Sequence, residues 1–580
     1  MWKYIKPYLH FAILAALFMV GEVLADLAQP TLMSQVVDEG VLGINNGGVS
    51  DLGLIMRVGG LMIVVVLLGG LSGSLNNIFV NFTGQNIGNL IRKDTFKSIM
   101  GFSFPQIDKF GTGSLITRTT NDITQVSNFI SNVFVRGMIR TGFLTFGSIY
   151  CMFRLNATFG WMVLGATPIL IAVMLICLWK ANPLFPVLQA QLDSVNEILQ
   201  EDISGIRIIK ACVREAYEKL RFGKANDAMV HTQLLTLIIF AFMTPVMNIM
   251  MNLVVVLILL VGAHQTSYGL MTPGVIMAAI TYTTQLLNGI NGMIMLFQNI
   301  SKGIASWARV KDILDTDAEL TDGEFTGAPP ETGTVEFKNV SFSFPGTERE
   351  VLHDFSLKIH PGETLAIMGA TGSGKSALVN LIPRFYDVTA GQILVDGIDV
   401  RQYRIEDLRS RISIALQKTQ LFSLPISENI RWGAPDADAD QIQQAIQTAQ
   451  ATAFVSELSG GQDAVLAERG NSLSGGQKQR LSIARAVVKP AEILIFDDST
   501  SALDLKTEAD LYHALAQRAA GTTRIMIAQR IASVRHADRI AVISDGVLAA
   551  CGTHEELLAN SQIYQDIYNS QQGKEDELDG

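Results

Sequence analysis

The residues with the clearest chemistry form a glycine-rich loop at 369–376, with the sequence GATGSGKS. The loop follows the apolar stretch 365–368 and has the spacing GxxxxGKS/T, in which glycines let backbone N–H groups converge on phosphate at the start of a helix. Lys375 would reach the terminal phosphates, and the Ser376 hydroxyl would bind Mg²⁺. We therefore expect a nucleotide site with contacts from Gly369, Thr371, Gly372, Ser373, Gly374, Lys375 and Ser376.

Two more motifs follow this loop along the chain. Residues 473–477, LSGGQ, open a predicted helix at 478–488 whose N-terminus can stabilise a phosphate. The apolar run 493–496 then ends in two consecutive carboxylates, Asp497 and Asp498. A glycine-rich loop, LSGGQ and a buried strand that ends in aspartate, in this order, resemble the nucleotide-binding domain of an ATP-binding-cassette (ABC) transporter.

The resemblance implies roles for residues outside these motifs. Phe344 would stack on the adenine of ATP, and Gln417 would contact Mg²⁺ and water as a sensor of the nucleotide. Asp497 would hold Mg²⁺ through water, so that Ser376, Gln417 and Asp497 form the metal set. Asp504 would lie across a dimer interface. The signature residues that would contact a nucleotide on the facing subunit are Ser474, Gly475, Gly476 and Gln477.

The chain departs from the family pattern at two catalytic positions. Asp498 stands where the family has a glutamate that polarises the attacking water, and Gln529 replaces the switch histidine. The shorter side chain withdraws the carboxylate by about 1.5 Å, and misplacement on that scale can lower a rate about 10²-fold. With Gln417, these residues form the predicted catalytic set. Together the two changes resemble the degenerate site of heterodimeric ABC exporters, which retains ATP more than it hydrolyses it.

The resemblance also implies that each ATP lies between the loop of one subunit and the signature motif of the other. Lys375, Asp498 and Gln529 would then belong to one site, and residues 473–477 to the second. The chain would donate an intact signature to a partner with its own glutamate and histidine, so a heterodimer with a second half-transporter is expected. The alternatives are a homodimeric lipid or drug flippase that runs slowly on Asp498, and a weakly hydrolysing regulatory subunit or ATP-gated channel.

The elements that position these motifs fall into two domains. The chain has 580 residues, 48% of them hydrophobic, with a mean hydropathy of +0.30, which indicates that part of it lies in a bilayer. We expect an α-helical transmembrane domain followed by an α/β ATPase domain of the P-loop type. The predicted boundaries are 1–315 for the transmembrane domain, 316–334 for a linker, 335–570 for the ATPase domain and 571–580 for a disordered acidic tail. Six segments are apolar and long enough to cross the membrane, near 11–33, 56–80, 130–153, 157–179, 235–262 and 272–297.

The distribution of charge predicts the orientation in the membrane. Lysines and arginines gather in the two long connections after the second and fourth segments, whereas the loops 38–51 and 263–272 have none. By the positive-inside rule, both termini and the ATPase domain face the cytoplasm of what looks like a bacterial plasma membrane. In the long connections, residues 111–122 and 205–215 match the family's coupling segments. A net charge of −10 disfavours nucleic-acid binding, and four scattered cysteines favour neither zinc nor disulfides.

The sequence specifies the substrate less closely than the nucleotide site. Methionine and amide side chains on the fifth and sixth segments suit varied small lipophilic compounds, as in multidrug efflux. Glu22 and Asp26 lie one helical turn apart in the first segment, where they would either attract lipophilic cations or be solvated near the outer leaflet. The candidate substrate contacts are Glu22, Asp26, Met247, Asn248, Gln285 and Asn288.

Overall fold

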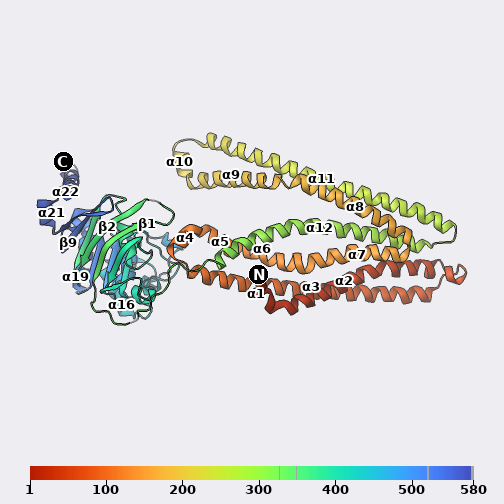
Figure 1. Cartoon of the computed structure of the whole chain (residues 1–580), viewed down its shortest axis with the longest axis horizontal. Helices are drawn as coiled ribbons and strands as arrows, with labels where there is room; N and C mark the ends of the chain where they lie inside the picture. The colour runs from red at the N-terminus through yellow and green to blue at the C-terminus, as the bar shows by residue number, and fades with distance from the viewer. Residues whose placement is uncertain (326, 348, 519–520, 577–580) are drawn as a thin grey trace. The chain divides into compact units, whose positions relative to one another are not determined.

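The computed structural model describes residues 1–325, 327–347, 349–518 and 521–576 of the chain (Figure 1). The chain divides into two compact units. The helical unit comprises Met1–Met100 and Gly113–Thr316, and the sheet unit comprises Gly101–Thr112 and Asp317–Gly580. A helical domain followed by an α/β domain is therefore confirmed.

The helical unit is built from long helices joined by short turns (Figure 1). Helix α2 lies along α3, α7 lies along α12, and α11 packs against both α8 and α9. The elements are α1 Trp2–Ile5, η1 Lys6–Tyr8, α2 Leu9–Gln35, η2 Val36–Val41, η3 Ile44–Asn46, α3 Leu52–Met100, α5 Thr112–Thr117, η4 Arg118–Asp122, α6 Ile123–Asn128, η5 Phe129–Gly137, α7 Met138–Leu155, α8 Ala157–Ala181, α9 Leu184–Ser204, α10 Ile206–Ala211, α11 Glu215–Ser267 and α12 Pro273–Leu314.

All six predicted membrane segments are helical, but they differ in hydropathy. Over the described residues, four helical stretches are long and apolar enough to span a bilayer: Trp2–Val41, Leu52–Met100, Ala157–Ser204 and Glu215–Ser267. The segments predicted near 130–153 and 272–297 form η5 with α7, and α12. They are less apolar because they carry polar side chains such as Arg140, Gln285 and Asn288, and this marks them as the helices that border polar space.

An ion pair between a buried carboxylate and a half-exposed guanidinium ties η4 to α12 inside the helical unit. Asp122 has only 4% of its side chain exposed. Its Oδ2 accepts a hydrogen bond from Arg309 Nε at 2.7 Å, and its Oδ1 accepts one from Ser306 Oγ at 2.9 Å. Burial alone would raise the pKa of the Asp122 carboxyl, but the hydrogen bonds from Arg309 and Ser306 outweigh burial and hold this pKa below its ordinary value.

Replacing Arg309 by alanine should destabilise the helical unit by about 2 kcal/mol, because the variant leaves a buried carboxylate with one neutral donor. Lys311→Ala is the matched control on the same helix, since Lys311 pairs with Asp315 on the surface at 3.6 Å, and it should cost about 0.5 kcal/mol or less. Chemical unfolding of the purified protein measures both.

The same pair sets the pH dependence of this stabilisation. Because the folded-state pKa of Asp122 is lowered, its contribution is present above the unfolded pKa of about 4 and is lost as the pH falls through the lowered value. The difference between wild type and Arg309→Ala should therefore shrink below about pH 4. A difference that stays constant in acid would contradict the assignment.

The sheet unit has two sheets. The first is antiparallel with strand order β2-β1-β4-β5, and the second has the order β10-β9-β3-β8-β7-β6. In the second sheet β9, β3, β8, β7 and β6 are parallel, and β10 pairs antiparallel with β9. The strands are β1 Val335–Ser343, β2 Glu350–Ile359, β3 Thr364–Gly369, β4 Ala390–Val395, β5 Ile398–Asp399, β6 Ile412–Ala415, β7 Ile493–Asp497, β8 Thr523–Ile527, β9 Arg539–Ser544 and β10 Val547–Gly552.

Strand β7 is buried along its whole length, because one of its faces packs with helix α13 (Lys375–Leu381) and the antiparallel sheet and the other with helices of the same unit. After β3, the sheet unit also has ten helices in the described residues. They are α13 Lys375–Leu381, α14 Ile405–Arg411, α15 Ile426–Arg431, α16 Ala439–Thr448, α17 Thr452–Glu457, α18 Gly475–Val487, α19 Leu505–Arg518, α20 Ile531–Val534, α21 His554–Asn560 and α22 Gln562–Asp576, with 3₁₀ turns η6 Gly461–Asp463 and η7 Glu468–Gly470.

The sheet unit includes Gly101–Thr112 of the first long connection, and this segment contains helix α4, Phe104–Phe110. The Phe104 ring lies 4.6 Å from the Phe385 ring, and Gln106 Nε2 donates to the Asp317 carbonyl at 2.6 Å. The motif 111–122 instead belongs largely to the helical unit, where Asp122 is held by α12.

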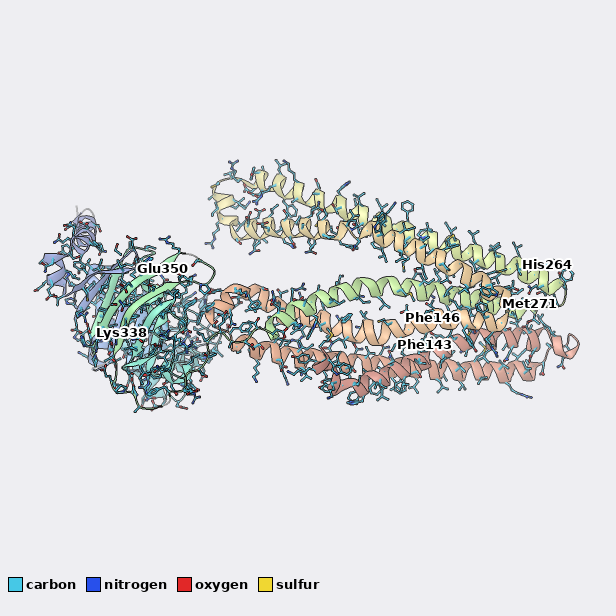
Figure 2. The ribbon with its side chains drawn as sticks, in the orientation of Figure 1. Phe143, Phe146, His264, Met271, Lys338 and Glu350 are labelled. Carbon is cyan, nitrogen blue, oxygen red and sulfur yellow. The ribbon has the colours of Figure 1, made fainter. Side chains whose placement is uncertain are left out.

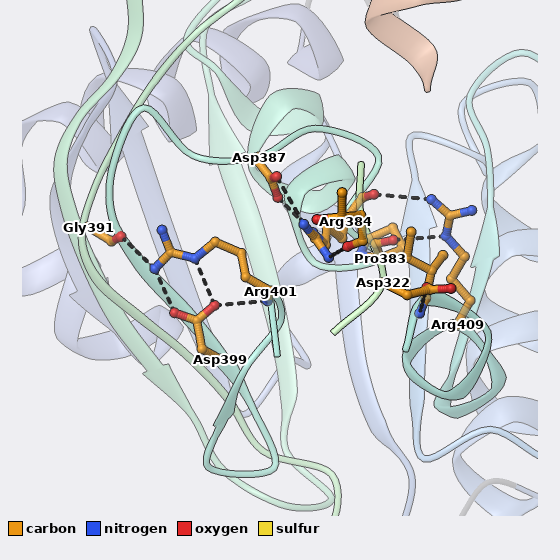
Figure 3. Close-up of polar contacts among 10 residues, drawn as sticks. Asp322, Pro383, Arg384, Asp387, Gly391, Asp399, Arg401 and Arg409 are labelled. Carbon is orange, nitrogen blue, oxygen red and sulfur yellow. Dashed lines mark hydrogen bonds and ion pairs between the residues drawn. The ribbon is translucent and has the colours of Figure 1, made fainter. Parts of the chain in front are cut away.

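Arginines fix the loop on which α4 rests (Figure 3). Arg384 donates to Asp387 Oδ1 at 2.7 Å and to the Thr321 carbonyl at 2.9 Å. Arg409 donates from the neighbouring helix to the carbonyls of Pro383 and Arg384, both at 3.1 Å. These bonds give Phe385 a defined position at the contact with α4. In the second connection, α10 contacts α9 within the helical unit.

Helix α22 continues to Asp576, into the tail that the sequence predicts to be disordered from residue 571. Gln571 is anchored there by two hydrogen bonds to residues 529–531. Residues 577–580 of the predicted tail lie outside the described residues.

Candidate nucleotide site

The glycine-rich loop connects β3 to α13, as the sequence predicts. Gly372 and Gly374 have φ values of +86° and +99°, a region that favours glycine. A Cβ at Gly374 would lie 2.9 Å from the Val351 carbonyl oxygen. The glycines therefore allow a tight turn that larger residues would obstruct.

Lys375 and Ser373 present polar groups in this turn. Lys375 is 9% exposed, and its Nζ donates to the carbonyls of Gly369 and Ala370 at 2.9 and 2.8 Å. Burial lowers the pKa of the Lys375 ammonium, and the charges of Asp498 and Asp497 act in the opposite sense. The Ser373 hydroxyl is buried without a hydrogen-bond partner among the described residues. A buried ammonium and an orphaned hydroxyl fit the phosphates of a nucleotide.

Asp497, at the end of β7, is 4% exposed and accepts a hydrogen bond from Ser376 Oγ at 2.9 Å. Burial raises the pKa of the Asp497 carboxyl, opposed by the bond from Ser376 and the charge of Lys375. A hydroxyl beside a carboxylate fits Mg²⁺, which uses few protein ligands together with water and phosphate oxygens. No cluster of three or more histidine, cysteine or acidic ligands occurs within the described part of the chain.

Asp498 is hydrogen-bonded by both glutamines of the predicted catalytic set. Its Oδ2 accepts from Gln529 Nε2 at 3.0 Å and from Gln417 Nε2 at 3.3 Å. Asp498 is 7% exposed and has φ +46°, a conformation that aspartate tolerates better than most residues. The carboxylate that would activate water is thus buried and engaged by two amides.

One cavity of about 590 Å³ is bordered by Lys375, Ser376, Asp498 and the two glutamines, whereas Ser373 and Asp497 are not among its lining residues. Phe344 lines it and is 37% exposed, as suits a ring that stacks on a base. The other lining residues are Arg349, Glu350, Val351, His353, Thr371, Gly372, Gly374, Lys375, Ser376, Ala377, Gln417, Asp498, Ile527, Gln529, Asp545 and Gly546.

The signature residues do not line this cavity. Ser474 caps α18, because its hydroxyl accepts from Gln477 N at 3.3 Å while Gln477 Oε1 accepts from Ser474 N at 2.8 Å. Gly475 and Gly476 form the first turn of that helix, and Asp504 Oδ2 accepts from Thr507 N at the start of α19. The helix start presented by Ser474–Gln477 is therefore separate from the site of Lys375.

Sequence reasoning missed one residue at this site. Gln571 on α22 donates from Nε2 to the Gln529 carbonyl, and its Oε1 accepts from Ile531 N, both at 2.8 Å. It holds the backbone of the segment that carries Gln529. Polar, glycine-containing sequence around 571 gave no signal for this contact.

The candidate substrate residues have four different environments. Met247 is 1% exposed in the apolar core of the helical unit and serves packing there, whereas Asn248 is exposed. Glu22 and Asp26 pair with Arg140. Gln285 and Asn288 line a cavity together with Asp26.

A phosphate-binding loop on a parallel sheet, fused to long membrane-spanning helices, defines a membrane transport ATPase. Residues 12–290 match the family described as ABC transporter transmembrane region, and residues 352–501 match the family described as ABC transporter. The chain belongs to the ABC transporters of the exporter type, with an N-terminal membrane domain fused to the ATPase domain.

Relatives support this assignment over nearly the whole chain. The ABC transporter ATP-binding protein YfiB of Bacillus subtilis is 38% identical, covering 99% of this chain and 98% of that protein. An ATP-dependent lipid A-core flippase of Syntrophus aciditrophicus is 34% identical, covering 89% and 86%. A solved structure of a bacterial Atm1-family ABC exporter with ATP bound has a TM-score of 0.76 at 26% identity, and the match covers 98% of each chain.

Proposed function

We propose that this chain is one half of a heterodimeric exporter in the plasma membrane that uses ATP to export lipophilic or amphipathic compounds of the multidrug type. Its own ATP site retains nucleotide, and its signature motif completes the catalytic site of a second half-transporter. The observation that carries the proposal is the Asp498 carboxylate, which is hydrogen-bonded by Gln529 and Gln417 where efficient hydrolysis needs a carboxylate directed at water.

The residues of the chain divide the work as follows. The glycine loop and Lys375 would bind the phosphates, and Phe344 would stack on the base. Ser376, Gln417 and Asp497 would hold Mg²⁺, Asp497 through water, and the bound metal would neutralise phosphate charge. Gln529 offers an amide where an imidazole could relay charge, so the site favours binding over turnover. Retained ATP stabilises the closed pair of ATPase domains, which drives alternation between inward-open and outward-open states.

An apolar cavity supports lipophilic substrates. It has a volume of about 910 Å³ and lies among α2, α3 and α7. Phe143 and Phe146 extend into it from α7 (Figure 2). Flexible apolar walls of this kind accept varied ligands.

The test is the ATPase activity of the purified chain, alone and co-expressed with a candidate partner that has the glutamate and histidine. The pair is then repeated with the partner's Walker B glutamate changed to glutamine. Activity that appears only in the pair and collapses with the partner variant is the expected result.

A second candidate, a homodimeric lipid flippase, is favoured by the relatives named as lipid A-core flippases. Brisk turnover by the chain alone would establish the homodimer and overturn the retained-ATP assignment.

A further inference from the structure

A polar cavity of about 500 Å³ lies inside the helical unit among α2, η5, α7 and α12. It is separate from the apolar cavity, because the two use different faces of α7: Arg140, Thr141 and Leu144 face this one, and Phe143 and Phe146 the other. The polar side chains that line it are Asp26, Asn132, Arg140, Thr141, Gln285, Asn288 and Asn299.

Three charged side chains lie together beside this cavity, and their charges do not cancel. Arg140 Nη1 is hydrogen-bonded to Glu22 Oε1, and Arg140 Nη2 lies 3.6 Å from Asp26 Oδ2. Two carboxylates share one guanidinium, so the cluster has a formal charge of −1. Among the described residues that line the cavity, only Asp26 and Arg140 carry charge.

The two carboxylates have different roles. Glu22 has 18% of its side chain exposed and fills space left by Gly73 on α3, where a Cβ would lie 2.9 Å from Glu22 Oε2. Asp26 is 45% exposed and makes the longer contact with Arg140. Glu22 therefore fixes the guanidinium, and Asp26 remains accessible from the cavity.

Gln285 adds a neutral acceptor to the same wall. Its Nε2 donates to the Asp26 carbonyl at 2.9 Å, which fixes the orientation of the amide because a carbonyl only accepts. Its Oε1 is buried and has no hydrogen-bond partner within the described residues. A carboxylate and an orphaned amide oxygen on one wall favour a positively charged ligand.

We propose that this cavity binds the cationic group of an amphipathic substrate at Asp26, and that Arg140 is a tethered counter-ion that the incoming cation displaces from that carboxylate. The proposal rests on the export function proposed above and names its substrate class as lipophilic cations. Val133, Leu144 and Leu296 line the same cavity and would contact the apolar part of the ligand.

The counter-ion makes binding selective. Without a ligand, Arg140 lowers the cost of two carboxylates within a membrane segment. A cation gains the interaction with Asp26, whereas an anion would have to separate Arg140 from Glu22 and face Gln285 Oε1. Selectivity thus comes from a difference between ligands of opposite charge and not from shape.

The experiment compares two probes of matched shape and opposite charge, tetraphenylphosphonium and tetraphenylborate. Binding is measured without nucleotide to the full-length protein in phosphatidylcholine nanodiscs, with empty nanodiscs subtracted. Asp26→Asn should weaken binding of the phosphonium about tenfold, and Arg140→Gln should strengthen it about tenfold. Arg140→Lys keeps the charge and should stay near wild type.

Glu39→Gln is the matched control, since it removes a carboxylate on η2 outside the cavity and should leave both probes unchanged. The gain expected for Arg140→Gln cannot arise from misfolding. The proposal is overturned if Asp26→Asn and Arg140→Gln shift phosphonium binding in the same direction or leave it unchanged, or if the wild type prefers the borate and loses it in Arg140→Gln. Because no ATP is used, failure here is distinct from failure of the ATPase test.

Discussion

Changing Asp498 to glutamate together with Gln529 to histidine should raise hydrolysis at this chain's own site about 100-fold. The added methylene moves the carboxylate about 1.5 Å towards the phosphates, and the imidazole removes one of the two amides that now engage Asp498. The measurement is the ATPase rate of the double variant paired with a partner whose Walker B glutamate is changed to glutamine. Turnover in that complex then belongs to the site of Lys375.

Each single variant should gain far less than the pair, because either change alone leaves one defect in place. Asp498→Glu also places a longer side chain at φ +46°, which costs up to about 1–2 kcal/mol of stability. Asp498→Asn is the matched control, since it keeps the shape and the tolerance for this backbone conformation but removes the charge. If the double variant hydrolyses ATP no faster than wild type, the retained-ATP assignment does not rest on these two residues.

Lys375→Ala should weaken ATP binding to this chain about 100-fold, which corresponds to about 2.7 kcal/mol. The variant removes the buried ammonium that lies at the phosphate loop and leaves Ser373 as the neighbouring polar side chain. Binding of a fluorescent ATP analogue to the purified protein measures the change.

Lys358→Ala, on the exposed side of β2, is the control and should bind nucleotide as wild type does. Folding should be largely unaffected by Lys375→Ala, because burial already disfavours the ammonium and lowers its pKa. Undiminished ATP affinity in this variant would contradict the assignment of the loop as the phosphate site.

The fold and the nucleotide residues were predictable because their signals are local. A phosphate loop needs glycines, lysine and serine within eight residues, and a long run of apolar residues predicts a membrane helix. The resemblance placed Asp498, Gln417 and Gln529 around one nucleotide, and the structure brings their side chains into hydrogen-bond contact, which the sequence alone did not predict. These predictions needed no knowledge of how distant helices pack.

The remaining errors and omissions are tertiary. Arg140 lies 118 residues from Glu22 in the sequence, and neither segment contains a pattern that predicts an ion pair of Arg140 with Glu22 and Asp26. Met247 belongs to a methionine-rich stretch that fits either ligand contact or packing. Its burial in the structure favours packing, and the sequence could not show that burial. The place of α4 in the sheet unit was not predicted, because Phe104 and Gln106 contact residues more than 200 positions away.

Gln571 gives the end of the chain a thermodynamic connection to the nucleotide. Its side chain bonds the backbone on both sides of Arg530, so the order of α22 and the position of Gln529 stabilise each other. Such coupling is reciprocal in free energy: if bound nucleotide fixes the position of Gln529, it should also protect the amides of α22 from solvent exchange, and a change that destabilises α22 should weaken nucleotide binding. The stability of α22 is therefore expected to be linked to nucleotide binding at this site.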